Sequence, residues 1–420
     1  MNLRTLRSAL FAVSTAVFPF ISSPLAAQSG QTPTVVTPAF DFSGVIFGSW
    51  GLRNDSAAHA ALGGKSPNQF GLDRAYLTFR MPAGDNTQIR VTTDVFQQTN
   101  AAAGAYYGGW VVRIKYGYVQ YTGLRDDFGA GSNLTGRIGI LHTVVIDHQE
   151  SFWPRYLSQV ALERNGFMAS ADAGAAGLLT LGNHWGEVYA TVVNGPGYTG
   201  VERDRFKDFA LRLSLTPFGN QKDLSPIWKS LAITPWFSKG WSPSTFAAGG
   251  LNEVGPGDNG AITDGLQKDR YGIFAGIKER RITAGAEWAQ RKDETDGPAN
   301  GNTATIPRVV VDSTGRLLDG FLLVRPVELF NSTSKSGLQL IGRYDRFTPN
   351  TDPVSVNYNG STPSYNFWVL GASYDITSRF LMALDWQVQD PNSFPTITGA
   401  GTVRPIPRSS SLFLHWQATF

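Results

Sequence analysis

The sequence predicts an all-β fold: a transmembrane antiparallel β-barrel of about sixteen strands, with short turns at one end and long loops at the other. Three observations lead to this prediction. Stretches of about ten residues alternate apolar and polar positions, the connections between them alternate between tight and long, and the last stretch ends on an aromatic residue, Phe420. The strand count is defined to within about two, so fourteen to eighteen strands agree with the pattern.

The alternation is clearest in residues 208–215. Every second position is apolar, and the others are polar or small; the apolar set is Phe209, Leu211, Leu213 and Leu215. A period of two places the two sets on opposite faces of a strand. A soluble β-sandwich alternates in the same way, so the connections between strands have to decide between the two folds.

The connections favour the barrel, because tight links and long polar stretches take turns along the chain. We expect strands near 39–53, 69–81, 87–98, 109–122, 135–143, 171–181, 184–194, 205–216, 230–240, 268–279, 281–291, 316–325, 337–346, 364–375, 378–389 and 409–420. The long stretches are 143–170, 241–267, 292–315, 347–363 and 390–408. Three connections on the short side, 123–134, 217–229 and 326–336, are longer than the pattern requires.

The first 27 residues have the three parts of a secretory signal peptide. Arg4 and Arg7 give a positive start, residues 8–21 are mostly apolar, and small residues precede a cleavage site after Ala27. We therefore expect residues 28–420 to form a single barrel domain in the outer membrane, in contact with its lipid. Residues 28–38 are far too few for the plug domain of an active transporter.

Composition excludes several other classes of function. The chain has no cysteine, so it offers no disulfide framework and no thiol nucleophile. Lysine and arginine number 36 against 33 aspartates and glutamates, without a basic block, so no nucleic-acid partner is expected. We expect no cofactor.

The final stretch carries a candidate assembly signal. Its apolar face ends in Trp416 and Phe420. This resembles the C-terminal signature by which Gram-negative outer-membrane proteins are recognised for insertion. The resemblance implies that the barrel-assembly machinery is a partner of this chain.

Short motifs along the chain resemble those of the phosphate-selective porins O and P. They are Leu72-Asp73-Arg74-Ala75-Tyr76-Leu77, Tyr116-Gly117-Tyr118-Val119-Gln120-Tyr121, Gly136-Arg137-Ile138-Gly139-Ile140-Leu141 and Arg343-Tyr344-Asp345-Arg346-Phe347. The resemblance implies a sixteen-stranded passive channel, usually a homotrimer, with its third loop folded inward. The lysine cluster and dense arginine ladder of the phosphate-specific members have no counterpart here.

Charged residues on the expected inner faces, and in the loop at 144–170, are the candidate pore-lining and constriction residues. Rings of charge at a narrow point are how pores discriminate between ions. On the strands the bases are Arg74, Arg80, Arg90, Arg137, Arg212, Arg270 and Arg343, and the acids are Asp94, Asp208, Glu287, Asp345 and Asp385. In the loop, Arg155 and Arg164 are expected at the constriction, with Asp147 and Glu150 holding the loop or tempering the field.

The predicted function is a porin for passive diffusion of small hydrophilic solutes, with a mild preference for anions. The alternatives are a channel specific for phosphate, polyphosphate or carboxylates and, more remotely, a barrel enzyme or adhesin. No catalytic residues are assigned. His142, Asp147, His148 and Glu150 lack a standard metal-ligand spacing. Gly63-Gly64-Lys65-Ser66 lacks the leading glycine of a phosphate loop, because His59 occupies its place.

Overall fold

The computed structural model describes residues 41–54, 59, 62–97, 109–202, 205–242, 266–298, 308–331, 333–352, 364–392 and 408–420. The predicted signal peptide lies outside these residues. Within the described part of the chain, no helix is long and apolar enough to span a membrane.

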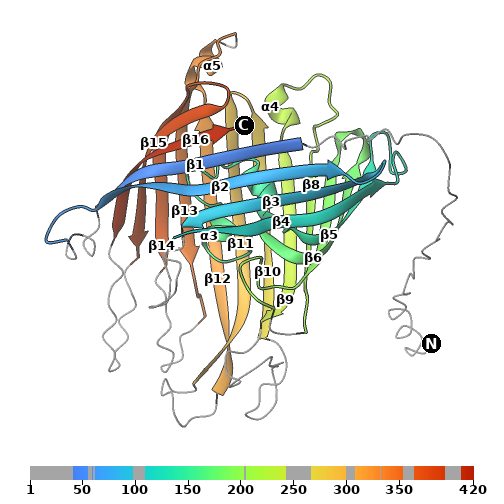
Figure 1. Cartoon of the computed structure of the whole chain (residues 1–420), viewed down its shortest axis with the longest axis horizontal. Helices are drawn as coiled ribbons and strands as arrows, with labels where there is room; N and C mark the ends of the chain where they lie inside the picture. Colours follow the sequence, from blue (N-terminus) through green and yellow to red (C-terminus); the bar gives the residue numbers. More distant parts are fainter. Residues whose placement is uncertain are drawn as a thin grey trace, which may run out of the picture. The chain divides into compact units, whose positions relative to one another are not determined.

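The described residues form sixteen antiparallel strands that close into one barrel (Figure 1). The strands are β1 (Asp41–Arg53), β2 (Asn68–Pro82), β3 (Thr87–Gln97), β4 (Trp110–Gly123), β5 (Asn133–His142), β6 (Ala171–Leu181), β7 (Gly186–Val193), β8 (Asp208–Leu215), β9 (Ala232–Ser242), β10 (Leu266–Glu279), β11 (Ile282–Pro298), β12 (Arg308–Val324), β13 (Leu338–Thr348), β14 (Tyr365–Asp375), β15 (Phe380–Pro391) and β16 (Ser409–Thr419). Each strand pairs with its neighbours in sequence, and β1 pairs with β16 to close the ring. The predicted fold class is confirmed.

The two faces of each strand differ as the alternation predicted. On β8, Ser214 is 4% exposed and shares a hydrogen bond of 3.1 Å with Thr234 of β9, inside the barrel. On the same strand, Phe209 is 49% exposed on the outer face. Large apolar side chains cover that outer face on many strands; they include Ile273, Leu318, Leu322, Leu340, Trp368, Leu370 and Leu384. An exposed apolar belt around a closed barrel is what lipid requires, because closure leaves no unpaired strand edge.

One predicted long loop is wrong in its extent. Strands β11 and β12 continue to Pro298 and back from Arg308, well into the stretch 292–315 that its polar composition assigned to a loop. The β-branched run Val309-Val310-Val311 lies within this part of β12 and favours a strand. Charged residues also pair across the hairpin: Lys292 Nζ lies 2.8 Å from Asp312 Oδ2. Opposite charges on adjacent strands stabilise such a pairing.

Short helices occupy two of the three long connections at the turn end. Helix α4 (Pro226–Lys229) lies between β8 and β9, and α5 (Pro326–Phe330) lies between β12 and β13. Both are seen at the same end of the barrel as the C-terminus (Figure 1). A further turn, the 3-10 helix η1 (Gly182–His184), joins β6 to β7. The helices explain why these connections exceed the length of a tight turn.

Candidate constriction in the barrel lumen

The connection between β5 and β6, residues 143–170, folds into the barrel; it is called the inward loop below. It contains helices α2 (Ile146–Glu150) and α3 (Ala161–Arg164). Val144, Val145 and Ile146 come one residue after the end of β5 and are completely buried. Three consecutive apolar residues cannot extend into water without a large free-energy cost, so the chain turns inward at this point. Phe152 and Trp153 then pack against the wall rings of Phe274 and Phe321.

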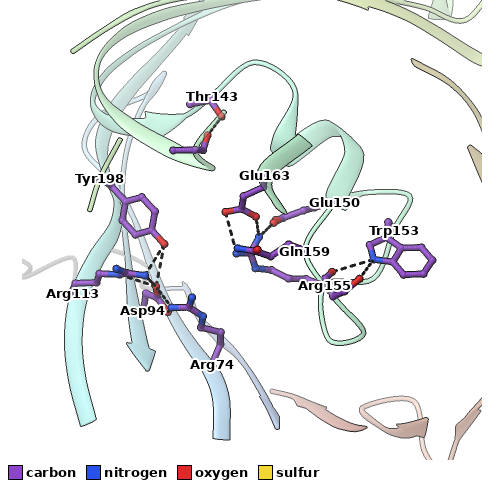
Figure 2. A network of polar contacts seen from close by, with 12 residues as sticks. Arg74, Asp94, Arg113, Thr143, Glu150, Trp153, Arg155, Gln159, Glu163 and Tyr198 are labelled. Carbon is purple, nitrogen blue, oxygen red and sulfur yellow. Dashed lines mark hydrogen bonds and ion pairs between the residues drawn. The ribbon is translucent and has the colours of Figure 1, made fainter. Parts of the chain in front are cut away.

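An internal network of charges shapes the inward loop. Arg155 Nη1 is paired with Glu150, and the same guanidinium donates to both carboxylate oxygens of Glu163 in α3 (Figure 2). Burial alone would lower the pKa of Arg155, but Glu150 and Glu163 raise it well above its usual value. The arginine therefore stays charged and connects the two helices of the loop. Glu150, expected to hold the loop or temper the field, is one of its two partners.

Wall arginines hold the inward loop by its backbone. Arg343 Nη1 donates to the carbonyl oxygen of Gln159 at 2.8 Å, and Arg291 Nη1 donates to that of Asn165 at 2.8 Å. Arg212 donates to the carbonyl of Val144 at 2.6 Å, and Arg270 donates to the carbonyl of Phe167. Carbonyl groups inside a folded loop need donors, and here strands β8, β10, β11 and β13 supply them.

Carboxylates pair with these same arginines, and Arg270 and Arg291 share one of them, Asp293. Their ion pairs are Arg212 with Glu187, Arg270 with Asp293, Arg291 with Asp293 and Arg343 with Asp345. Lys268 pairs with Asp208 at 2.8 Å on the same side of the barrel. Three of the predicted pore-lining residues thus point inward and bond to the loop backbone: Arg212, Arg270 and Arg343. Arg212 and Arg343 are almost completely buried beneath the loop.

Asp94, on β3, forms ion pairs with arginines of the two neighbouring strands, β2 and β4. Its carboxylate is completely buried and accepts from Arg74 Nη1 at 3.0 Å and from Arg113 Nη2 at 2.8 Å. Tyr198, from the connection after β7, donates to the same oxygen at 3.2 Å. Figure 2 shows this group on the wall strands, apart from the network within the inward loop.

Three cations on β3, β4 and β5 have no carboxylate partner among the described residues. Arg90 lies over the ring of Tyr116, and Lys115 Nζ lies 4.4 Å from the ring centre of Tyr76. Arg137 lies over the rings of Tyr118 and Tyr189. Aromatic faces attract cations without neutralising them. The unbalanced positive charge of the lumen wall is therefore concentrated on these strands.

The other predicted site residues lie inside the barrel or at its rim. Arg80 is directly opposite Arg90 in the register of β2 and β3, and it bonds to Asp41 at 3.1 Å. In the inward loop, Asp147 Oδ1 lies 3.5 Å from His142 Nε2. On the opposite wall, Glu287 accepts from Trp236 Nε1 at 3.0 Å, and Asp385 Oδ2 lies 2.9 Å from His415 Nε2. In the described chain, no group of three or more histidines and acids is arranged to hold a metal ion.

Two cavities border the inward loop. One has a volume of about 440 Å³ and lies between the loop and strands β1, β2, β15 and β16; Arg74, Arg155 and Arg164 are among its lining residues. The other, of about 670 Å³, lies between the loop and the turn ends of β6–β10; His148, Glu187 and Lys278 line it. Arg164 also lies over the ring of Phe367, 3.5 Å from its centre.

Sequence reasoning missed Lys115 and Asp73, both of which lie at β-bulges. The register between β3 and β4 shifts at Thr92/Thr93, and the register between β1 and β2 shifts at Phe47/Gly48. A bulge adds one residue to a strand, so two neighbouring side chains can point inward and the period of two is broken. Within each strand the sequence alone carries no signal for this shift.

Solved outer-membrane proteins share this fold. No family model and no curated protein matches the sequence. The chain is similar to the anion-selective porin from Comamonas acidovorans (TM-score 0.51, 11% identity), covering 91% of this chain and 99% of the porin. It is also similar to the outer membrane channel DcaP of Acinetobacter baumannii (TM-score 0.54, 10% identity), covering 91% of this chain and 97% of DcaP. A third similar structure is OmpT of Vibrio cholerae in its trimer form (TM-score 0.54, 10% identity), covering 91% of this chain and 99% of OmpT.

The closed sixteen-stranded ring, its apolar outer belt and the inward loop define a porin-type β-barrel. The chain has the barrel fold of these outer-membrane channels. At such low identity the likeness establishes the fold, and the solute has to be argued from the lumen.

Proposed function

We propose that this chain is a porin: a water-filled channel, and not an enzyme, that lets small hydrophilic solutes diffuse across the outer membrane with a mild preference for anions. The inward loop narrows the lumen, and solutes pass between it and the wall. Anionic solutes are favoured because low-dielectric walls focus the field of any unbalanced charge.

The observation that carries the proposal is the distribution of paired and unpaired cations. Each arginine under the loop is paired with an acid, whereas Arg90, Lys115 and Arg137 have no carboxylate partner among the described residues. Guanidinium groups meet carboxylate and phosphate oxygens with paired donors. Asp147, on the loop, tempers this positive field without balancing it.

Assembly is part of the proposal. A homotrimer in outer-membrane lipid is supported by the trimer form of the similar OmpT. Insertion through the barrel-assembly machinery is supported by the aromatic end of β16, with Trp416 on its outer face and Phe420 at the terminus.

The test is a reversal-potential measurement on purified protein in a planar bilayer under a potassium chloride gradient. We expect chloride to be favoured modestly at low salt and less at high salt, because the screening length shortens from about 10 Å at 0.1 M to about 3 Å at 1 M. A cation-selective reversal potential at low salt contradicts the proposal.

Adding phosphate to the same bilayer separates a general channel from a phosphate-specific one. The motifs that resemble those of the phosphate-selective porins favour an anionic solute in either case. Block of the chloride current by millimolar phosphate identifies the specific form, and an unchanged current identifies the general form.

A further inference from the structure

The 440 Å³ cavity between the inward loop and strands β1, β2, β15 and β16 contains unbalanced charge of both signs. Its volume lies within the range of small-molecule sites. Many charged groups inside the barrel lie 2.6–3.0 Å from an opposite charge, whereas two groups that line this cavity have no such close partner among the described residues.

The negative group is Asp73. It is the extra residue of the bulge in β2, and its side chain is exposed to the cavity. One carboxylate oxygen accepts a hydrogen bond from Ser49 Oγ at 3.2 Å. Among the described residues it has no ion pair, although the next residue in the chain, Arg74, is committed to Asp94.

The positive group is Arg164, at the end of α3. Its Nη2 donates to Gln389 Oε1 at 2.7 Å, while Nη1 has no hydrogen-bond partner in the described chain. The nearest carboxylate, Asp345, is 4.0 Å away and already accepts two hydrogen bonds from Arg343. Burial lowers the pKa of Arg164, which is the sign of a charge that its surroundings do not fully compensate.

The rest of the lining suits a small organic molecule. Phe47, Leu157 and Phe413 give apolar surface, and Gln159 and Gln387 also line the cavity. A simple anion would meet Arg164 but would be repelled by Asp73. A solute that carries both charges satisfies both groups, and specificity of this kind rests on attraction and repulsion together.

We propose that this cavity is a subsite for small zwitterions, namely free amino acids with an apolar side chain. The ammonium group lies at Asp73, the carboxylate at Arg164, and the side chain against Phe47 and Phe413. This inference rests on the proposed channel function, because the cavity must lie on the path between the loop and the wall.

The test measures uptake of radiolabelled L-leucine into liposomes that contain the purified protein. We expect saturable uptake that excess unlabelled L-valine reduces, and that an equal excess of uncharged arabinose leaves unchanged. Labelled N-acetyl-L-leucine, which has lost the ammonium group, should enter without saturation. Leucine uptake that does not saturate, or that matches N-acetyl-leucine uptake, overturns the subsite.

Two variants separate binding from folding. Asp73→Asn should lower leucine uptake at low concentration at least about fivefold and raise that of N-acetyl-leucine, because an acid that repels the anion has gone. Arg164→Gln should lower both. Asp223→Asn, which removes an exposed acid in the connection between β8 and β9, is the matched control and should change neither. An Asp73→Asn protein that treats both solutes as the wild type does contradicts the assignment.

The same liposomes, fused to a planar bilayer, show which proposal has failed. Anion-preferring conductance with non-saturating leucine uptake overturns the zwitterion subsite and leaves the channel intact. If the wild type conducts no ions and takes up no leucine, the channel function fails and the subsite fails with it.

Discussion

Arg343 and Asp345, two residues apart on β13, form a bidentate ion pair of 2.7 and 2.8 Å beneath the inward loop. The third donor of the guanidinium, Nη1, bonds to the carbonyl of Gln159 in the loop at 2.8 Å. The carboxylate holds the arginine flat against the wall, in the orientation that lets it reach the loop backbone. One pair thus connects the barrel wall to the segment that narrows the lumen.

Replacing Arg343 by glutamine should therefore release this part of the loop. Removing one partner of a buried ion pair leaves the other uncompensated, at a cost of roughly 3–5 kcal/mol. We expect a lower free energy of unfolding and a single-channel current with larger fluctuations, measured in a planar bilayer. Arg346→Gln, on the outer face of the same strand, is the matched control. If the current of Arg343→Gln is as steady as that of the wild type, Arg343 does not hold the inward loop in place.

The orientation of β8 makes a second prediction. Leu213→Arg puts a charge on the lipid face and should destabilise the barrel by roughly 2–4 kcal/mol at mid-bilayer. Ser214→Arg should cost much less, because Ser214 lines the 670 Å³ cavity, in which the longer side chain can approach Glu187. Denaturant unfolding of both variants in the same lipid measures the difference. Equal destabilisation at the two positions contradicts the assigned faces.

A third prediction concerns the C-terminal residue, Phe420. Phe420 exchanges backbone hydrogen bonds with Gly44 at 2.9 and 3.0 Å, and its ring lies 5.7 Å from that of Phe42. Phe420→Asp, or deletion of Phe420, should sharply lower the amount of barrel in the outer membrane, scored by heat-modifiable migration on gels. Gln417→Asp, on the inner face of β16, serves as the control. Normal assembly of the Phe420 variants argues against the assembly signal.

Ion preference should follow the unpaired cations. We expect the double change Arg90→Gln and Arg137→Gln to bring the chloride-to-potassium permeability ratio close to one while conductance persists, because diffusion needs no single residue. Reversal potentials at low salt provide the measurement. Lys239→Gln, on the outer face of β9, should leave the ratio unchanged. A double variant that keeps the wild-type ratio shows that other charges set the preference.

Acid should loosen the inward loop through His148. Burial and the nearby Arg212 lower the pKa of His148 to about 3, where its ring packs against Phe152 and Phe274. The unfolded chain binds this proton at its ordinary pKa of about 6.5, so stability falls as the pH is lowered from 6.5 towards 3. Near pH 5 the loss from this one group is about 2 kcal/mol.

A His148→Gln variant isolates that contribution. The amide keeps a polar contact to Thr234, which lies 3.1 Å from the imidazole, but it takes up no proton in this range. We expect the unfolding temperature of the variant to decline less between pH 7 and pH 4.5 than that of the wild type. Parallel declines show that His148 does not titrate in the folded barrel at the low pKa assigned to it.

Much of the fold could be predicted because alternation has a strict physical cause. A strand in lipid must present apolar side chains on one face, so residues such as Phe209 and Leu213 reveal both the strand and its orientation. The hairpin beyond Lys292 was missed because most of the stretch 292–315 is polar, although the β-branched run Val309-Val310-Val311 is a strand signal and a cross-strand charge pair adds to it.

The candidate site was predictable only in part, for two physical reasons. Alternation places Arg212 and Arg343 inside the barrel, but only the path of the inward loop shows that they bond to its carbonyls. Lys115 and Asp73 were not predicted because a bulge changes which side chains point into the barrel from that position on. A bulge depends on pairing with the neighbouring strand, which the sequence of one strand does not show.

The pairing of β1 with β16 has a consequence for the time course of folding. Every other pair of neighbouring strands is joined by a connection along the chain, so those hairpins can form locally. The last seam joins strands from opposite ends of the sequence, with Val45 opposite Thr419. Long-range contacts of this kind form slowly. Until they form, a nascent molecule is an open sheet with two unpaired edges, exposed to proteases and to the edges of other chains.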